Sequence, residues 1–484
     1  MSETILTWSS LAPAVSEIYL TVAVCVLLLA DAFMGVKRQR LTASLALLIL
    51  ASGAAVTALY GHVDSRTLLF DGLYVADQLG YVLKLFGFLF VAFALLYSRS
   101  YLEQRGLLRG EYFMLALTAL LGVFVLVSAN NLITVYIGVE LLALSVYTLV
   151  AFDRDSGIAA ESAMKYFVLG AIASGTLLYG MSMVYGLTGT LSLDQLATQV
   201  GGAGQGLSAG VILGLVFIVV AVAFKLGAVP FHMWLPDVYH GAPTSVTLFI
   251  ATAPKIGYFA LTFRLLAYGF DGATAEWTQM LAALAVLTLV VGNVVAIVQT
   301  NLKRMLAYST IANVGFIVLG FVAGTPGGYS AALYYTLVYV LVALGSFGVI
   351  VLASHKGFEA DQLDHYKGLY ARDPLLALCM MMLMFSTAGV PPFVGFWAKL
   401  RIIQELWNTG HSWLVVIAAA TSVIGAFYYL RVVKLMYFDP PESLPQPERD
   451  VGVRIALALN AAAVLILGLL PGPLLDLCAR LISR

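Results

Sequence analysis

Long apolar runs follow one another along nearly the whole chain, and short polar connections separate them. A helix needs about 20 apolar residues to cross a bilayer, because each residue rises ~1.5 Å through a ~30 Å hydrocarbon core. The pattern therefore predicts an all-α polytopic membrane protein with about 14 transmembrane helices. The expected spans are 11–35, 41–61, 78–98, 112–128, 131–151, 161–186, 208–228, 243–268, 277–298, 303–323, 327–354, 374–409, 413–438 and 452–476.

The composition excludes most other classes of protein. Hydrophobic residues make up 61% of the 484 positions and charged residues 11%, about half the charged share of a globular protein. The 26 basic and 26 acidic residues balance, so no electrostatic bias toward nucleic acid exists. Cys25, Cys379 and Cys478 lie far apart in apolar runs. Neither an iron–sulfur site nor a disulfide framework is expected from them.

The lysines and arginines between the spans predict the orientation of the chain. Most of them fall in one alternating set of connections, and Arg66, Arg480 and Arg484 lie on the opposite side. Basic connections stay in the cytoplasm, so we expect loop 355–373 there, and loop 187–207 and both termini in the periplasm of a bacterial inner membrane. No connection is long enough for a soluble domain. Residues 1–484 should form a single membrane domain.

Charged residues inside the expected spans are the candidates for function. A charge at bilayer depth costs at least ~2.5–3.5 kcal/mol on insertion scales, so it tends to face a bundle interior, a partner or water. The candidates are Glu140, Lys165, Lys225, Lys255 and Lys399. The alternative for each is a structural ion pair or a side chain that reaches the membrane surface, and for Lys165 both interpretations stand.

Three further charges favour the structural interpretation. Lys84, Arg264 and Arg401 lie near span ends or lack a comparable sequence context. In contrast, the candidate set combines one central carboxylate with several lysines. A lysine in apolar surroundings can lose its charge near neutral pH, and a nearby carboxylate restores it. Such a series of residues can take up, hold and pass on protons.

Prolines interrupt two of the expected spans. Proline removes an intrahelical hydrogen bond and clashes with the preceding turn, and irregular backbone at membrane depth survives only inside protein or beside water. We expect non-helical backbone near 229–231, with the helix continuing to about residue 240, and again near 390–393. The breaks read alike, since Val229-Pro230-Phe231 precedes Trp234 and Val390-Pro391-Pro392-Phe393 precedes Trp397.

Paired broken helices, here the seventh and twelfth, are typical of inverted-repeat transporters with sites near the midplane. We therefore expect N-terminal helices 1–3 in 1–111, a first five-helix repeat in 112–268 (helices 4–8), a second in 277–438 (helices 9–13) and a C-terminal helix in 452–484. The repeat is a hypothesis, because the two halves share little sequence.

Polar residues beside the first break offer a second kind of site. His232, Asp237 and His240 could suggest a metal centre, but their spacing fits no standard motif and prolines spoil a common helix face. We prefer a relay in which His232 takes protons from Lys225. Tyr308, Ser309, Thr310 and Asn313 are explained equally by helix–helix hydrogen bonds and by a water wire.

Three motifs carry a family resemblance. They are KLGAVPFHMWLPDVYHGAPTSVT, QTNLKRMLAYSTIANVGF and FSTAGVPPFVGFWAKL. The chain resembles, over nearly its whole length, the antiporter-like membrane subunits of respiratory NADH:quinone oxidoreductase (complex I). Lys399 and the context of Lys255 in ATAPKIGYF are similar to the N-type subunits, whereas M-type subunits carry a glutamate where Lys399 stands.

The resemblance implies a proton channel with an uptake half and a release half. By matched motif, Glu140 would pair with Lys225, Lys165 would lie between them, Lys255 would occupy the central axis, and Lys399 would serve the release half. It also implies that FMN, iron–sulfur clusters, NADH and quinone belong to partner subunits. The expected partners are the M-type and small membrane subunits of the complex and the lipid bilayer.

Three functions remain open on the sequence. The leading hypothesis is a proton-translocating subunit of complex I, driven by redox chemistry on other subunits. The second is an Mrp-type sodium/proton antiporter subunit, although only Asp237 and carbonyls offer obvious oxygen ligands for sodium. The third is a passive assembly scaffold. Copurification with redox subunits separates the first from the second, and loss of activity without loss of assembly separates the first from the third.

Overall fold

The computed structural model describes residues 11–34, 38–202, 207–441 and 450–483, and almost all of them are helical. The long helices are α2 (Val15–Met34), α3 (Gln39–Tyr60), α4 (Gln78–Gln104), α5 (Gly110–Val127), α6 (Leu132–Val150), α7 (Gly157–Thr188), α9 (Ala209–Leu226), α13 (Thr274–Ile297), α14 (Leu302–Val322), α15 (Pro326–Ala353), α19 (Ser412–Phe438) and α20 (Val451–Leu469). The shorter ones are η1 (Ala12–Ala14), α8 (Leu193–Gly201), α10 (Trp234–Gly241), α11 (Thr244–Ile250), α12 (Ala253–Thr262), η3 (Phe263–Gly269), η4 (Asp271–Ala273), η5 (Leu363–Tyr366), α16 (Leu369–Arg372), α17 (Pro374–Ala388), α18 (Val394–Asn408) and α21 (Gly472–Ile482).

The predicted integral membrane architecture is confirmed. In the described part of the chain, 13 helical stretches are long and apolar enough to cross a membrane. The other expected span, 374–409, consists of α17 and α18 on either side of a break. Side chains that accept a backbone N–H start several helices, as Asp77 does from Gly80 at α4 and Asn131 does from Ile133 at α6. Such N-caps satisfy donors that have no partner within the helix.

The eighth expected span, 243–268, is not one regular helix. It divides into α11 and α12 at Ala251 and Thr252, and then continues as the π-helical turn η3. Pro254 lies in the first turn of α12 and has no N–H for the preceding turn. The hydroxyl of Thr252 donates to the carbonyls of Leu248 and Phe249, which closes the end of α11. This break places Lys255 at the start of a helix.

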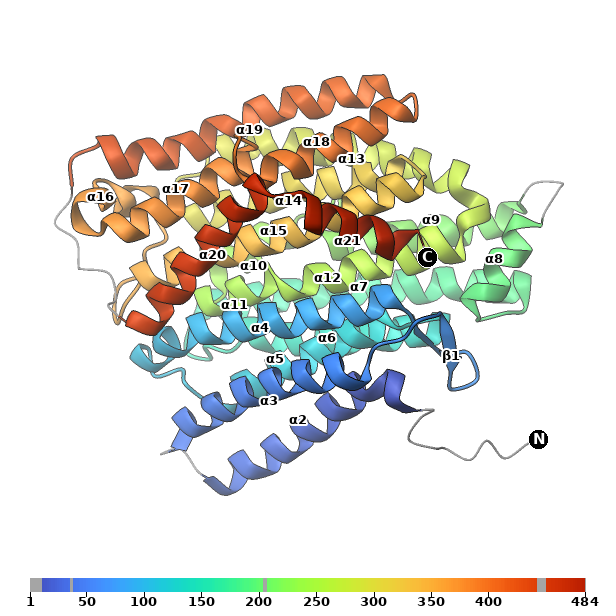
Figure 1. Ribbon diagram of the computed structural model, residues 1–484, viewed down its shortest axis with the longest axis horizontal. Helices are drawn as coiled ribbons and strands as arrows, with labels where there is room; N and C mark the ends of the chain where they lie inside the picture. The colour runs from blue at the N-terminus through green and yellow to red at the C-terminus, as the bar shows by residue number, and fades with distance from the viewer. Residues whose placement is uncertain (1–10, 35–37, 203–206, 442–449, 484) are drawn as a thin grey trace.

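The long helices pack side by side into a bundle, with their axes roughly aligned (Figure 1). Helices α14, α15 and the α11–α12 pair are almost entirely buried at its centre. Helices α2 and α3 form one edge of the molecule in Figure 1, and α19 lies along the opposite edge. The small antiparallel hairpin of β1 (Thr67–Leu69) and β2 (Tyr74–Ala76) pairs Leu68 with Val75.

The two ends of the bundle differ in charge. Arg105 donates to the carbonyls of His355 and Phe358, at 3.0 and 3.1 Å, and pairs with Glu359, so the basic connections meet at one end. The hairpin and α8 lie at the other end, and the first and last described residues lie toward that same end (Figure 1). The described residues of loop 187–207 and loop 355–373 therefore lie at opposite ends, as expected. Which end faces the cytoplasm stays a prediction.

A polar cluster at the hairpin end ties α8 to its neighbours. Arg66 pairs with Asp194 at 2.7 Å, the Asn130 amide donates to the same carboxylate at 2.8 Å, and the Tyr268 hydroxyl donates to it as well. Burial acts to raise the pKa of Asp194, but the bonds from Tyr268, Asn130 and Arg66 outweigh it and hold the pKa below its ordinary value. Because the carboxylate stays ionised, it holds these connections together.

Candidate functional site

The first predicted helix break is confirmed. Helix α9 ends at Leu226, residues 227–233 form turns, and α10 starts at Trp234. Gly227 has a φ of +86°, a conformation that side chains with a Cβ rarely adopt. The N–H of Val229 donates to the Thr288 hydroxyl at 2.9 Å, and the Trp234 indole N–H donates to the Phe224 carbonyl at 3.0 Å. Side chains thus satisfy the freed backbone, as buried irregular chain requires.

The second break is confirmed in the same way. Helix α17 ends at Ala388, residues 389–393 are non-helical, and α18 starts at Val394. Gly389 has a φ of +87°. The N–H of Gly395 donates to the Ser386 hydroxyl at 3.1 Å, and the Trp397 indole donates to the Gly468 carbonyl at 2.8 Å. Each break contains one cis X-Pro peptide, Val229-Pro230 in the first and Pro391-Pro392 in the second.

Lys225 and Glu140 lie near the first break without forming an ion pair. Lys225 is in the last turn of α9, 3% exposed, and its amine donates to the Ser174 hydroxyl of α7 at 3.2 Å. Glu140 is halfway along α6, and its Oε1 is buried with no hydrogen-bond partner among the described residues. The expected direct pair is therefore not formed among the described contacts, although Glu140 lies near enough to Lys225 for a Coulomb interaction.

Lys255 and Lys399 occupy matching positions at the two breaks. The Lys255 amine, 2% exposed, donates to the Leu226 carbonyl at 3.4 Å. The Lys399 amine donates to the Ala388 carbonyl at 3.1 Å. Each carbonyl belongs to the last residue before the positive-φ glycine, where a broken helix ends. A cation is favoured there, because the end of a helix carries partial negative charge.

The surroundings of Lys399 are polar but contain no carboxylate partner among the described residues. A cavity of about 20 Å³ beside it is lined by Asn313, Tyr335, Tyr339 and Ser386. This volume holds about one water molecule. The Phe316 ring covers the amine from 5.3 Å, a distance that suits a cation–π contact.

A series of hydroxyl and amide groups extends from this cavity across α13, α14, α15 and α19. Tyr339 donates to the Thr310 hydroxyl at 2.6 Å, and Tyr335 donates to the side-chain amide oxygen Oδ1 of Asn313 at 2.7 Å. Three more side-chain hydrogen bonds continue the series. They join Ser309 to Tyr429 at 2.5 Å, Tyr428 to Tyr429 at 3.1 Å, and Tyr428 to Asn293 at 3.1 Å. Ser309, Thr310 and Asn313 were recognisable from their place in one span. The tyrosines were missed, because their rings suit packing as well as their hydroxyls suit hydrogen bonds.

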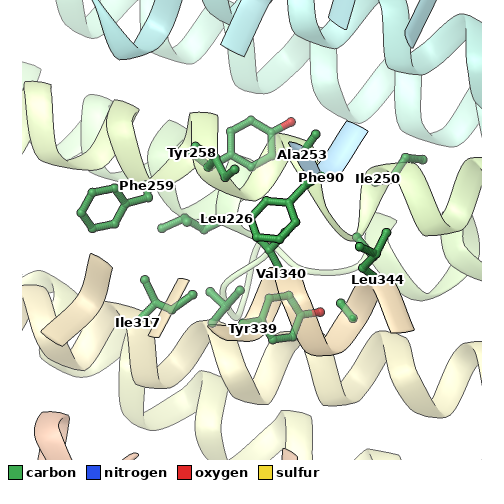
Figure 2. Close-up of a cluster of buried hydrophobic side chains, with 14 of the residues drawn as sticks. Phe90, Leu226, Ile250, Ala253, Tyr258, Phe259, Ile317, Tyr339, Val340 and Leu344 are labelled. Carbon is green, nitrogen blue, oxygen red and sulfur yellow. The ribbon is translucent and has the colours of Figure 1, made fainter. Parts of the chain in front are cut away.

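An apolar cluster lies between the surroundings of the two breaks. Figure 2 shows Phe90, Leu226 and Val340 packed together, with Tyr258 on one side of them and Tyr339 on the other. All of these side chains are buried. Tyr258 lies within reach of the charge of Glu140, whereas Tyr339 belongs to the hydroxyl series beside Lys399. Apolar side chains thus pack between Tyr258 and Tyr339 in this part of the core.

Comparisons with known proteins agree over the full length. The family profile "NADH:quinone oxidoreductase/Mrp antiporter, TM" matches residues 129–425, which contain all three sequence motifs. NADH-quinone oxidoreductase subunit N of Thiobacillus denitrificans is 52% identical over 98% of this chain and 97% of the relative. Subunit N of Nitrosomonas europaea is 51% identical over 98% of both chains.

The chain belongs to the family of NADH-quinone oxidoreductase subunit N.

Solved structures support the same membership. A chain of respiratory complex I from Thermus thermophilus with bound aureothin is 33% identical, with a TM-score of 0.83 over 96% of this chain and 99% of that one. A chain of the archaeal membrane-bound sulfane sulfur reductase is 27% identical, with a TM-score of 0.86 over 98% and 97%. The Mrp complex from Dietzia contains a chain with a TM-score of 0.84 at 21% identity over 99% and 97%, which shows that the fold is shared. The N-type resemblance of the sequence is confirmed.

Lys165 pairs with carboxylates other than Glu140. Its amine pairs with Glu161 of its own helix at 2.8 Å and with Asp237 of α10 at 3.0 Å. The Lys165 side chain is 46% exposed. These ion pairs agree with the structural interpretation that the sequence left open, and a place for Lys165 between Glu140 and Lys225 stays a prediction.

The polar residues after the first break do not gather into a metal site. Asp237 accepts from Lys165 and from Arg304, the latter at 2.9 Å, so both carboxylate oxygens are engaged. His232 lies in the turn, where its Nδ1 is buried without a hydrogen-bond partner in the described chain. No hydrogen bond joins His232 to Lys225 in the described chain, where Lys225 donates to Ser174 instead, and the relay role of His232 stays a prediction.

The three charges that were interpreted as structural each have a partner. Lys84 pairs with Glu17 at 2.8 Å, and Arg264 pairs with Asp77 at 2.7 Å. Arg401 donates to the neighbouring Gln404 side chain at 3.2 Å. The two ion pairs join helices that are distant in the sequence, so the sequence alone did not reveal which carboxylates complete them.

Proposed function

We propose that this chain is a proton-translocating membrane subunit of a bacterial complex I in the inner membrane, and that it acts without redox chemistry of its own. Its subunit N relatives are named for NADH-quinone oxidoreductase, and the Thermus structure is a respiratory complex I. NADH, FMN, the iron–sulfur clusters and quinone would then belong to partner subunits. The nearest partners would be the M-type and small membrane subunits.

The observation that carries this proposal is the placement of three lysine amines at two helix breaks. Lys225 and Lys255 lie at the first, with Glu140 nearby, and Lys399 lies at the second. A buried amine can exist with or without its proton, depending on nearby charge and water. The breaks supply backbone carbonyls that hold the charged form without a permanent counterion.

The open Glu140–Lys225 pair is the proposed coupling element. When the two groups approach, the carboxylate stabilises the proton on Lys225, and when they separate, the proton is released to Lys255. Coupling between the redox subunits and this channel needs such an element with two states. The redox site and the proton site must each shift the balance between those states.

The two-repeat organisation, 112–268 and 277–438, is part of the proposal. A Cβ at Gly122 would meet the Leu142 nitrogen at 2.6 Å, and a Cβ at Gly292 would meet the Ala312 nitrogen at 2.7 Å. Helices α5 and α6 therefore touch as closely as α13 and α14 do. The two breaks are also alike. Each has a glycine of positive φ, Gly227 or Gly389, and a lysine amine that donates to the carbonyl before it, which further supports two repeats.

An Mrp-type sodium/proton antiporter remains the second candidate, since the fold of the Dietzia chain is similar. Sodium binding would need several converging oxygen ligands. Asp237, the carboxylate that the sequence offered for this purpose, is already paired with Lys165 and Arg304. We therefore favour proton transfer.

The test uses the native complex purified from wild-type cells and from cells that carry Glu140→Gln. In vesicles we expect the wild type to couple NADH oxidation to proton uptake without sodium. The Glu140→Gln complex should contain every subunit yet show roughly 10²-fold less activity, the range lost with a proton-transfer group. Full activity of this variant, or isolation of the chain without redox subunits, would overturn the proposal.

A further inference from the structure

An open groove runs between α2 and the adjoining ends of α5 and α6. Its volume is about 580 Å³, and its walls include Leu28 of α2, Leu115 of α5 and Phe152 just after α6. Leu28 is 54% exposed, so the groove faces the outside of the bundle. Because these helices cross the membrane, an apolar groove on their outer face lies against lipid chains.

Two opposite charges stand at one end of the groove. Glu111 is in the first turn of α5, and Arg154 is in the connection that follows α6. Both are exposed, and neither forms an ion pair with any residue that the structure describes. This end belongs to the basic side of the bundle, where lipid headgroups would meet the helix ends.

We propose that this groove binds a phospholipid whose headgroup carries both an ammonium with N–H donors and a phosphate, as phosphatidylethanolamine does. The acyl chain lies along Leu28, Leu115 and Phe152. Arg154 donates to the phosphate, and Glu111 accepts from the ammonium, so both headgroup charges are met by charge-assisted hydrogen bonds. A purely anionic headgroup satisfies Arg154 but is repelled by Glu111.

A second groove on the other side of α2 provides an internal control. It lies between α2 and α3, has a volume of about 490 Å³, and is lined by apolar residues such as Ile18, Val22, Leu45 and Ile49. None of its lining residues is charged. It is therefore expected to accept acyl chains of any phospholipid without selecting a headgroup.

The experiment compares two photoactivatable lipids that differ only in the headgroup. The native complex is placed in vesicles that contain a phosphatidylethanolamine or a phosphatidylglycerol with the same reactive group in the acyl chain. After illumination, mass spectrometry measures labelling of α5 at Leu115 and of α3 at Leu45 and Ile49. We expect α5 to prefer the ethanolamine lipid by about two- to fivefold, the range that one exposed charge pair gives. Labelling of α3 should be equal for both lipids.

Variants test each charge separately. Glu111→Gln should abolish the preference at α5, because only Glu111 bonds the group in which the two lipids differ. Arg154→Gln should lower the labelling of α5 by both lipids without abolishing the preference, Arg154→Lys should restore most of the labelling, and labelling of α3 should stay unchanged in all three. Equal labelling of α5 by the two lipids in the wild type would mean that only annular lipid contacts the groove. Absence of labelling at α5 while α3 is labelled would mean that protein covers the groove. Either result would overturn the proposal.

Discussion

The two helix breaks share a backbone design and differ in their charges. At each, a helix ends before a glycine of positive φ, and a lysine amine bonds the last carbonyl, Leu226 in one case and Ala388 in the other. The first break has a second amine, Lys225, and a carboxylate, Glu140, that acts on it. The second has hydroxyls, an amide and a small cavity around Lys399.

Under the proposed function, this difference distinguishes lysines that would only hold a proton from the lysine whose proton a moving carboxylate would control. A backbone carbonyl is fixed, so it stabilises a charged amine by the same amount in every state. A carboxylate that moves changes its stabilisation with distance, steeply where the surroundings are apolar. Under the proposed function, only the first break contains a carboxylate that could switch the proton on a lysine. The second would depend on water and on the hydroxyl series to pass the proton on.

The largest expected effect comes from removing the amine at the responsive break. Lys225→Ala deletes the proposed proton carrier and removes a positive charge that lies near the half-buried Glu140, so the carboxylate loses a favourable Coulomb interaction. We expect assembled complex with roughly 10²-fold less quinone reductase activity and pumping. Subunit composition and vesicle assays measure both. If the variant retained more than half of the wild-type pumping, Lys225 would not give the first break the special role proposed here.

A smaller loss is expected at the second break. Lys399→Met removes a proton carrier, so pumping should fall by about tenfold or more. No carboxylate is left unpaired, because none contacts Lys399 in the described structure. Heat-induced dissociation of the complex should therefore occur at the wild-type temperature for Lys399→Met and at a lower one for Lys225→Ala. An equal fall in the dissociation temperature for both variants would show that the two breaks do not differ in their electrostatics as described.

The hydroxyl series predicts a modest effect that belongs to the second break alone. Tyr335→Phe removes the bond to Asn313, and we expect pumping to fall by about two- to tenfold, as for the loss of one hydrogen bond. Tyr334→Phe is the matched control, because the hydroxyl of Tyr334 is buried without a partner among the described residues. Steady-state rates in vesicles compare the two. Equal rates for both variants would indicate that the series only packs helices.

The smallest effect on pumping is expected for a structural ion pair. Asp77→Asn keeps an oxygen to cap α4 but removes the charge that pairs with Arg264. The complex should be less stable to heat, since Arg264 is left buried with weaker partners. Activity per assembled complex should match the wild type. A loss of pumping comparable to that of Lys399→Met would assign Arg264 to the proton path.

Hydrophobic periodicity and proline positions predicted the spans and both main breaks, because each depends on local chemistry. The break at Ala251 and Thr252 was missed although Pro254 marks it, since a single proline within a span also fits a kinked but continuous helix. Which carboxylates pair with Lys84, Arg264 and Lys165 depends on which helix faces meet. The central tyrosines were missed because a tyrosine in an apolar run is indistinguishable from an ordinary packing residue.

The most direct test of the central claim is proton pumping by the complex that carries Lys225→Arg. Arginine preserves the positive charge near Glu140 but keeps its proton throughout the accessible pH range. If Lys225 passes protons under the control of Glu140, the complex should assemble with wild-type composition and heat stability and lose nearly all proton uptake and coupled quinone reduction. Pumping at the wild-type rate would show that the charge of Lys225 has a structural role only, and the account would be contradicted.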